Sequence, residues 1–335
     1  MSSKVLVTGG LGYIGSHSVV DLIEKGIEVV IVDNLNNTRI EVLDGIERIS
    51  GQRPTFYQVD ITDNTALREV IIKESGINSV IHFAAYKAVG ESVEFPLKYY
   101  QNNVGGLLSL LSVMREFEIN NIVFSSSCTV YGDTESSPVD ESTPVVEAAS
   151  PYGTTKIMCE EILRDISNAT SLNVVNLRYF NPVGAHKSAE IGELPLGVPS
   201  NLVPYITQTA AGIRGELTIH GNDYSTPDGT CLRDYIHVVD IANAHAMALQ
   251  WMMNNNCDFE VFNLGTGKGN SVLEVVQTFE KVNGQTLNYK IGPRRSGDVT
   301  QIWASTEKAK KILNWEAKLD LDEMMRSAWN WQKRL

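Results

Sequence analysis

The stretch VLVTGGLGYIG, residues 5–15, decides the fold of this chain. Its apolar beginning predicts a buried strand over residues 4–8, and the apolar residues from Tyr13 to Lys25 have helical spacing. The glycines between and after them follow the pattern G-x-x-G-x-x-G: Gly9, Gly12 and Gly15. Such glycines permit a tight turn and let backbone N–H groups approach a pyrophosphate at a helix N-terminus. The stretch therefore predicts a dinucleotide-binding turn. The alternative, a tight turn without a ligand, is disfavoured because a strand and a helix flank the glycines.

The first half of the chain alternates short β-rich runs with helical stretches. Further strands are predicted at residues 28–32, 55–59, 79–83, 121–126 and 173–178, and further helices at 64–74, 96–117 and 151–167. Strands in which apolar residues do not alternate with polar ones, and which are separated by helices, imply a parallel sheet buried on both faces. We therefore predict an α/β protein with a Rossmann-like, doubly wound parallel sheet, whose ligands bind at the carboxyl ends of the strands.

The composition of the chain changes after residue 180, where Pro, Gly and Asn become frequent. We predict a NAD-binding Rossmann domain over residues 1–180, completed by a helix and a strand within about 237–264. A smaller mixed α/β domain for the substrate is then expected at 181–236 and 265–335. A simple division into two domains near residue 180 is the alternative.

Bulk properties exclude several classes of function. The chain has 335 residues and a formal net charge of −12, which disfavours nucleic-acid binding, because that requires a basic surface. The four cysteines have no metal-ligand spacing, so we expect no metal site and reduced thiols. No apolar run is long enough to span a membrane, and the N-terminus does not have the pattern of a signal peptide. A soluble, cytoplasmic protein without a membrane partner is expected.

Two acidic residues follow predicted strands on the cofactor side. Asp33 lies 18 residues after Gly15, at the end of the second strand. A carboxylate at this position accepts hydrogen bonds from a free ribose 2′-OH and repels a 2′-phosphate, so it predicts NAD and not NADP. Asp60, after the third strand, is placed to face the adenine side. The alternative for Asp60 is an ordinary acidic residue leading into the following helix.

The stretch YGTTK places Tyr152 and Lys156 four residues apart, on one face of a predicted helix. Ser150 is a candidate N-cap of this helix and Pro151 its first residue. Because a Tyr-x-x-x-Lys spacing is common by chance, it needs support from a second motif. Support comes from Ser127, at the end of the strand predicted over residues 121–126, since it would bring a hydroxyl to the same rim of the sheet. A surface helix and a strand end without chemistry form the alternative.

This set of side chains suits the removal of a hydroxyl proton. A free tyrosine has a pKa near 10 and is a poor base at neutral pH. A lysine ammonium at ~4 Å would stabilise the phenolate by about 4 kcal/mol at an effective dielectric constant of ~20. Tyr152 is therefore predicted to act as the base while hydride leaves for NAD, and Ser127 to hydrogen-bond the reacting oxygen.

At these residues the sequence resembles the UDP-hexose 4-epimerases of the extended short-chain dehydrogenase/reductase family, along its whole length. The matching stretches besides residues 9–15 are VDNL (32–35), HFAA (82–85), KAVGES (87–92), YYQNN (99–103), SPYG (150–153), RYFNPVGA (178–185), NLVPY (201–205), RDYIHV (233–238) and RRSGD (294–298). The resemblance implies that UDP-glucose and UDP-galactose are interconverted through a 4-ketosugar, with NAD bound tightly. It also implies a homodimer formed through the helices around residues 104–117 and 152–168, although the apolar faces of these helices could equally belong to the core.

The resemblance assigns residues to two ligands. Those expected to contact NAD are Gly9, Gly12, Tyr13, Ile14, Gly15, Asp33, Asn34, Asn37, Asp60, Ile61, Phe83, Ala84, Lys87, Asn102, Ser125, Tyr152, Lys156 and Tyr179. Those expected to contact the UDP-sugar are Lys87, Ser127, Tyr152, Phe180, Asn181, Asn201, Leu202, His220, Arg233, Arg295 and Asp298. The guanidinium groups of Arg233 and Arg295 suit a pyrophosphate, because their geometry matches phosphate oxygens. Surface ion pairs are the alternative role for these arginines.

Two positions depart from the family pattern. Ile302, before Trp303, stands where the size of a pocket residue decides whether an N-acetyl group fits, and its volume predicts partial exclusion of N-acetylhexosamines. His220 stands where an aromatic ring often stacks on uracil, and a surface histidine at a strand end is the alternative.

Two other functions remain as rivals. A nucleotide-sugar dehydratase or decarboxylase shares the glycines and the Tyr-x-x-x-Lys pair. A dehydratase would carry acidic groups beside the serine, where this chain has Cys128 and Thr129. The second rival is a cofactor-binding regulator without turnover, which would not need Tyr152.

Overall fold

The computed structural model describes residues 4–134, 137–255, 257–295 and 297–335. These residues form two compact units. Unit 1 comprises residues 1–132, 144–178 and 242–262, and unit 2 comprises residues 133–143, 179–241 and 263–335, apart from the residues that are not described. The predicted division into two functional domains stays a prediction.

Unit 1 is built on a seven-stranded sheet. Its strands in chain order are β1 (Lys4–Thr8), β2 (Glu28–Asp33), β3 (Thr55–Gln58), β4 (Ile77–His82), β5 (Asn121–Ser127), β6 (Asn173–Tyr179) and β11 (Phe259–Leu264). Their order across the sheet is β11-β6-β5-β4-β1-β2-β3, and the pairs β1–β2, β1–β4, β2–β3 and β4–β5 are parallel. The chain reverses direction across the sheet between β1 and β4, where ligands of doubly wound sheets bind. The predicted fold class is confirmed.

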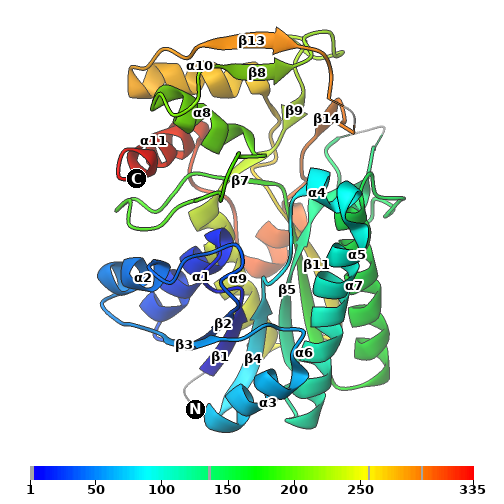
Figure 1. The fold of residues 1–335 in the computed structure, drawn as a ribbon. Coiled ribbons are helices and arrows are strands. Elements are labelled where there is room, and N and C mark those ends of the chain that lie inside the picture. Colours follow the sequence, from blue (N-terminus) through cyan, green and yellow to red (C-terminus); the bar gives the residue numbers. More distant parts are fainter. Residues whose placement is uncertain (1–3, 135–136, 256, 296) are drawn as a thin grey trace. The chain divides into compact units, whose positions relative to one another are not determined.

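Helices cover both faces of this sheet. Figure 1 shows α1 (Tyr13–Glu24), α2 (Val42–Ser50) and α9 (Val238–Asn254) on one side, and α3 (Asn64–Lys73), α6 (Gly105–Glu116) and α7 (Pro151–Ala169) on the other. The sequence patterns did not predict α2 or the short helix α4 (Val89–Glu94).

The helix predicted over residues 96–117 is present and includes a π-helical turn. This segment consists of α5 (Pro96–Tyr99), a π-helical turn η1 (Tyr100–Val104) and α6. A π-helical turn adds a residue to the helical repeat and often marks a functional position. Here it contains the buried Asn103, whose amide accepts a hydrogen bond from the Tyr86 N–H at 2.8 Å and donates to the Thr155 hydroxyl at 3.1 Å. The turn therefore connects the loop after β4 with α7.

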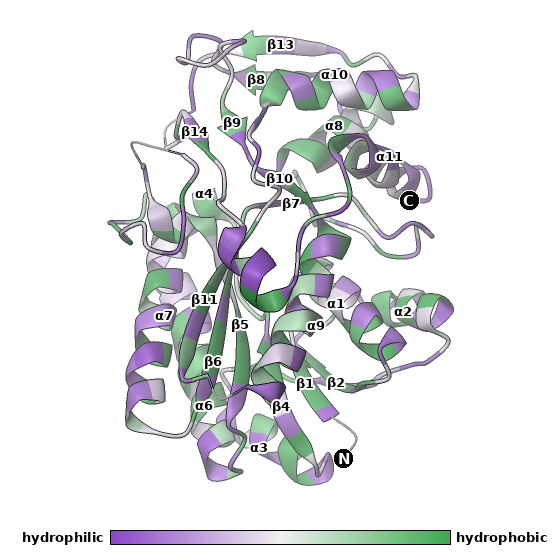
Figure 2. Cartoon of the chain, turned by 180° about the vertical axis from the view of Figure 1, so that it is seen from behind, coloured by the Kyte–Doolittle hydropathy of each residue, from purple (hydrophilic) through white to green (hydrophobic). Residues whose placement is uncertain are grey.

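The core of unit 1 lies between the sheet and the helices α3, α6 and α7. It contains Leu6 and Val30 from the sheet, Leu67 and Leu110 from the helices, and Leu163 from α7, all at most 1% exposed. The strands are hydrophobic along much of their length, whereas the helices alternate hydrophobic and hydrophilic residues (Figure 2). This is the pattern of a parallel sheet with both faces buried.

Unit 2 is a mixture of small sheets and helices. The strand pairs are β7 (Asn181–Val183) with β10 (Tyr235–His237), and β8 (Leu217–His220) with β13 (Tyr289–Gly292). A third sheet has the order β12 (Asn270–Ser271), β9 (Leu232–Arg233) and β14 (Gln301–Ile302). The helices of unit 2 are α8 (Leu202–Ala210), α10 (Val272–Asn283) and α11 (Leu321–Gln332), and a π-helical turn η3 spans Ala309–Leu313. Unit 1 contains in addition a 3₁₀ turn, η2 (Cys128–Tyr131). Buried Val275, Phe279 and Met325 contribute to the core of unit 2.

The four cysteines are free, as expected for reduced thiols. Within the described ranges, no helix combines the length and apolar character needed to cross a membrane.

Candidate active site

The glycine turn between β1 and α1 requires its glycines. Gly9 has φ +69°, and a Cβ added there would lie 2.7 Å from the backbone nitrogen of Ala84. A Cβ at Gly15 would lie 2.2 Å from the carbonyl oxygen of Gly9. Gly12, the N-cap of α1, provides no side-chain cap, and the first turn of the helix contains no acidic residue. A helix N-terminus of this kind attracts an anion, and the arrangement fits the pyrophosphate of a dinucleotide.

Asp33 ends β2 beside this turn. Its buried carboxylate accepts hydrogen bonds from the N–H groups of Leu11 (3.2 Å) and Leu35 (2.9 Å) and from the Thr38 hydroxyl (3.0 Å). Burial raises the pKa of Asp33, and the three hydrogen bonds oppose that shift. The carboxylate therefore fixes the glycine turn to the end of β2, at the position where a ribose 2′-OH is expected.

Asp60 and Asn34 contact each other after their strands. The Asn34 amide donates to the Asp60 carboxylate at 2.8 Å, and Asp60 also accepts from the N–H and hydroxyl of Thr62. Burial would raise the pKa of Asp60, but the hydrogen bonds from Thr62 and Asn34 outweigh it and lower the pKa. The N-cap of α3 is Asp63, whose side chain accepts from the Ala66 N–H. Asp60 is thus not the capping residue of α3.

Other predicted cofactor residues lie around the same end of the sheet. The Lys87 ammonium lies 5.8 Å from the centroid of the Tyr13 ring. The Phe83 ring contacts His245 of α9, with centroids 4.6 Å apart. Ile61 packs in the core. Asn37 is exposed, Ile14 and Ala84 are half-buried, and the Asn102 amide donates to Asn103.

The helix α7 presents the predicted catalytic pair. It begins at Pro151, and its N-cap Ser150 accepts a hydrogen bond from the Gly153 N–H, as predicted. Tyr152 and Lys156 are both buried, and the Lys156 ammonium lies 5.9 Å from the centroid of the Tyr152 ring. The same ammonium donates to the Ser125 carbonyl of β5 at 2.7 Å.

Ser127, the last residue of β5, is also buried. Its hydroxyl accepts a hydrogen bond from the Thr129 N–H at 3.3 Å, at the beginning of η2. The contact of Lys156 with Ser125 therefore brings the face of α7 that carries Tyr152 to the strand end that carries Ser127.

Burial changes the ionisation of this region. It lowers the pKa of Lys156 to about 8, while the neighbouring Cys159 and Glu160 act to raise it. His82, at the end of β4, has its pKa lowered to about 3 by burial and by the charge of Lys156. His82 is therefore neutral, and its Nδ1 lies 2.7 Å from the Thr8 hydroxyl. Lys156 is an ammonium at neutral pH and a neutral amine in alkaline solution.

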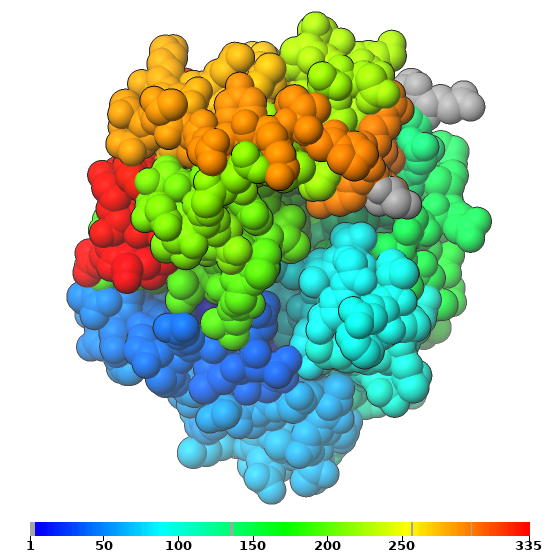
Figure 3. Space-filling model, turned by 45° about the horizontal axis from the view of Figure 1, so that its top comes forward, coloured from blue at the N-terminus to red at the C-terminus, as the bar shows by residue number. Residues whose placement is uncertain are grey.

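Three residues of unit 2 expected at the nucleotide form one charged cluster. Arg295 contacts the Asp298 carboxylate with Nε at 3.1 Å and Nη2 at 2.8 Å, and Arg233 Nη2 lies 3.7 Å from the same carboxylate. The segment after β13 is at the surface (Figure 3). The Arg295 side chain is 57% exposed, whereas those of Arg233 and Asp298 are 15% exposed. Ser296, within the same motif, lies outside the described residues.

The remaining predicted substrate residues are distributed over unit 2. The Asn201 amide donates to Glu193 at 2.7 Å, and Leu202 begins α8 and packs against the core. His220 ends β8, is exposed, and has its Nδ1 3.3 Å from the Pro293 carbonyl. Phe180 is buried and Tyr179 half-buried.

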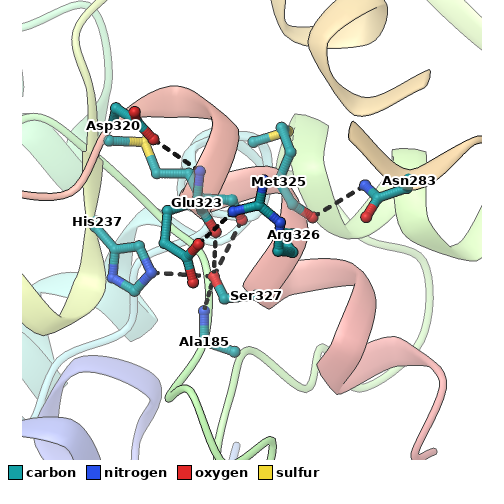
Figure 4. Close-up of polar contacts among 9 residues, drawn as sticks. Ala185, His237, Asn283, Asp320, Glu323, Met325, Arg326 and Ser327 are labelled. Carbon is teal, nitrogen blue, oxygen red and sulfur yellow. Dashed lines mark hydrogen bonds and ion pairs between the residues drawn. The ribbon is translucent and has the colours of Figure 1, made fainter. Parts of the chain in front are cut away.

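Asn181 lies on β7, which pairs with β10, and Ser327 of α11 fixes the end of this pair (Figure 4). His237 Nδ1 accepts from the Val239 N–H, so Nε2 carries the proton and donates to the Ser327 hydroxyl at 3.0 Å. Ser327 also accepts from the Ala185 N–H at 3.2 Å and donates to the Glu323 carbonyl at 2.8 Å. Burial lowers the pKa of His237 to about 4, which agrees with a neutral ring.

Asp234 is a residue that the motif reading did not assign. Its carboxylate is fully buried and accepts from the N–H groups of Thr266 (2.8 Å), Gly267 (3.2 Å) and Ala304 (3.2 Å). The one indication of a role for Asp234 in the sequence is its position between Arg233 and Tyr235, in a stretch that resembles the 4-epimerases. The carboxylate joins β9 to the segment that follows β14.

A doubly wound sheet with a glycine turn at β1, an acidic residue ending β2, and a Ser, Tyr and Lys set at β5 and α7 defines a class. The class is that of NAD-binding short-chain dehydrogenases/reductases in their extended form.

Comparison with known proteins narrows this class. The chain matches a family model described as GDP-mannose 4,6 dehydratase over residues 6–328. It is 50% identical to the UDP-glucose 4-epimerase of Erwinia amylovora, over 99% of this chain and 98% of that protein. It is similar to the crystal structure of UDP-glucose-4-epimerase from Stenotrophomonas maltophila with bound NAD and formylated UDP-arabinopyranose, with a TM-score of 0.97, 47% identity and coverage of 99% and 98%. The enzyme from Bifidobacterium longum in complex with NAD⁺ and UDP gives a TM-score of 0.95, 46% identity and the same coverage. The chain belongs to the NAD-dependent epimerase/dehydratase family, in its UDP-glucose 4-epimerase group.

Proposed function

We propose that this protein interconverts UDP-glucose and UDP-galactose by inverting the configuration at C4. The observation that carries the proposal is the buried Tyr152–Lys156 face of α7, joined to the end of β5 by the hydrogen bond from Lys156 to Ser125. Full-length similarity to UDP-glucose 4-epimerases supports the choice of substrate.

The chain's own residues supply the proton chemistry. The Lys156 ammonium stabilises the Tyr152 phenolate, which removes the proton of the sugar 4-OH and later returns it. Ser127 hydrogen-bonds the reacting oxygen and stabilises the charge that develops on it. When bound, NAD would supply a reversible acceptor for the C4 hydride, so that hydride can return to the opposite face of the sugar ring. Because the proton and the hydride are both returned, the cycle needs no net oxidant.

The cluster of Arg233, Arg295 and Asp298 is proposed to hold the UDP part of the substrate. Guanidinium groups match phosphate oxygens, and the carboxylate accepts from hydroxyl or N–H groups of the nucleoside. Holding the substrate by UDP leaves the hexose free to turn over between the two hydride transfers. Asn181, Asn201, Leu202 and His220 complete the proposed set.

The test is product analysis after incubation of the purified protein with UDP-galactose. UDP-glucose is the expected product, with no accumulation of NADH. Steady formation of NADH would identify a dehydrogenase and contradict the proposal.

A dehydratase is the second candidate, because the matching family model carries that description. It is disfavoured because Cys128 and Thr129 follow Ser127 where a dehydratase would have acidic groups. The same product analysis distinguishes the two, since a dehydratase would release water and leave a deoxy-ketosugar.

We also propose that the protein is a cytoplasmic homodimer formed through α6 and α7. Most apolar residues of α6 are buried in the core of unit 1, but Leu108 is 47% exposed, and Met158 of α7 is 40% exposed. The segment of α4 and α5, also at the surface in Figure 3, adds Val93 and Leu97, which are 63% and 66% exposed. A second copy would cover these side chains. Size-exclusion chromatography with light scattering should give a dimer for the natural chain and a monomer for Leu108→Glu combined with Met158→Glu.

A further inference from the structure

A buried ion pair lies one helical turn beyond Lys156, on the face of α7 that carries Tyr152 and Lys156. Glu160 is four residues after Lys156, as Lys156 is four residues after Tyr152, so the three side chains share one face of the helix. Arg178 of β6 contacts the Glu160 carboxylate with Nε at 2.9 Å and Nη2 at 2.5 Å. Both side chains are at most 4% exposed. None of the roles proposed above uses this pair.

The pair connects to the chain on both sides of Ser127. The hydroxyl of Ser126, the preceding residue, donates to Glu160 Oε1 at 2.5 Å. On the other side, Arg178 Nη1 donates to the hydroxyl of Tyr131, the last residue of η2, at 3.1 Å. Ser126 and Tyr131 are fully buried. The backbone that presents Ser127 is therefore held at two points by one ion pair.

The same pair fixes the position of α7 relative to β5. Two contacts join the helix to the strand end: Lys156 to the Ser125 carbonyl, and Ser126 to Glu160. Consecutive residues of β5 thus contact consecutive turns of the α7 face. A buried ion pair contributes little net stability compared with apolar residues of the same volume, but its fixed hydrogen bonds specify one arrangement.

We propose that the Glu160–Arg178 ion pair is a positioning device that sets Ser127 and the Lys156 ammonium relative to Tyr152. Neither residue touches the substrate. They act through Ser126, Tyr131 and helix α7. The kinetic test of this inference rests on the proposed function. The spectroscopic test rests on the structure alone.

The mildest test is Ser126→Ala, which removes one hydrogen bond and leaves both contacts between Arg178 and Glu160 in place. Loss of one such bond should lower kcat for UDP-galactose about five-fold. KM should not change, because the nucleotide is held by other residues. Ser18→Ala is the matched control, because the buried Ser18 hydroxyl on α1 has no hydrogen-bond partner in the described part of the chain, and it should leave both constants unchanged.

The stronger test is Glu160→Gln, which removes the negative charge near Lys156. The titratable or charged groups around Lys156 are Tyr152, Cys159 and Glu160 on its own helix, His82 on β4 and Arg178 on β6. Loss of the carboxylate, together with the positive charge of the now unpaired Arg178, disfavours the ammonium form of Lys156 and lowers its pKa. The alkaline limb of the kcat profile should move to lower pH by about one unit.

A readout without substrate separates this inference from the proposed function. In protein containing isotope-labelled lysine, the NMR signal of the Lys156 ammonium, assigned by its loss in Lys156→Arg, should titrate at lower pH in Glu160→Gln than in the natural chain. If the natural chain does not epimerise UDP-galactose, the proposed function fails, and this titration still tests the positioning role.

If Glu160→Gln does not fold, Glu160→Leu combined with Arg178→Leu replaces the pair with apolar side chains of comparable volume. A folded double variant with kcat reduced at least ten-fold supports positioning. The proposal is overturned if the double variant keeps the kcat of the natural chain, if Ser126→Ala behaves like Ser18→Ala, or if the Lys156 titration does not move in a folded Glu160→Gln protein.

Discussion

The end of β5 and α7 in unit 1 and the arginine cluster of unit 2 are built in contrasting ways. Ser127, Tyr152 and Lys156 come from the end of a strand and the first turns of a long helix, and each is at most 6% exposed. Arg295 and Asp298 come from an irregular segment, and the Arg295 side chain is 57% exposed. The first group is buried, with Lys156 held by a hydrogen bond to the backbone of β5, whereas the second consists of charged side chains that pair with one another.

The contrast matches what each group is proposed to do. Proton transfer requires atoms held at fixed positions, and a base with an ionisation set by its surroundings. Capture of a charged ligand requires accessible charges, which in the protein contact one another: Arg295 pairs with Asp298, and Arg233 lies beside the same carboxylate. Changes in the first group should therefore affect kcat, and changes in the second should affect KM.

The largest effect is expected for Tyr152→Phe, which removes only the phenolic hydroxyl. Epimerisation should fall about 10²- to 10⁴-fold, because the general base is lost. Tyr289→Phe, on the exposed strand β13, is the control and should retain full activity. Chromatographic separation of UDP-glucose and UDP-galactose measures both. A Tyr152→Phe protein that keeps its epimerase activity would show that Tyr152 is not the general base.

The next effect is expected for Arg233→Ala, which tests the second group. Loss of a charge-assisted hydrogen bond of about 1.5–3 kcal/mol should raise KM about 10- to 100-fold. The control is Arg294→Ala, because Arg294 pairs with Asp223 at 2.8 Å and stacks on the Tyr224 ring at 4.1 Å. Equal increases in KM for both variants would show that general surface charge, and not the cluster, attracts the substrate.

A smaller and graded effect is expected from pH. Burial lowers the pKa of Lys156 to about 8, so the ammonium is present below that pH and is lost as the pH rises through it. kcat should therefore decrease above about pH 8, by about ten-fold for each pH unit. The pH profile of Lys156→Arg checks the assignment, since a guanidinium stays protonated and should remove this limb. A limb that persists unchanged in Lys156→Arg belongs to another group.

The smallest effect is expected for Ile302→Ala. Ile302 is 5% exposed and lies opposite Arg233 in the register of β14 and β9. Shortening its side chain should increase the ratio of activity on UDP-N-acetylglucosamine to activity on UDP-galactose by a few-fold, because about 1 kcal/mol of steric exclusion is at stake. Ile291→Ala, on the exposed face of β13, is the control. An unchanged ratio would remove Ile302 from the determinants of specificity.

The sequence predicts the sheet of unit 1 well for a physical reason. Strands β1 and β5 begin at the expected residues. Both are runs in which apolar residues do not alternate with polar ones and which end at Gly or Ser, and such runs are characteristic of buried parallel strands. The π-helical turn at residues 100–104 could not be predicted in this way, because Asn103 of this turn contacts Tyr86 and Thr155, which are distant in the sequence.

The same distinction applies to the candidate site. Motifs indicate Tyr152, Lys156 and Ser127 as candidates, because the proposed chemistry requires those side chains at that spacing. The partners that hold them are less visible. Glu160 occupies the same helix face as Lys156, which is a signal, but Arg178 and Ser126 become its partners only through the pairing of β5 with β6. The roles of individual residues toward NAD and the UDP-sugar stay predictions.

The hydroxyl of Ser327 has a consequence for handling the protein. It lies in the last helix, and it accepts from Ala185 and His237 at the ends of β7 and β10. Proteolytic removal of α11 would take away this acceptor and expose to water both donors and the apolar core that Met324 and Met325 help to form. Protein shortened at this end should therefore bind the UDP-sugar poorly while the glycine turn of unit 1 is still intact. If a batch binds dinucleotide normally but has low epimerase activity, its mass should be measured first.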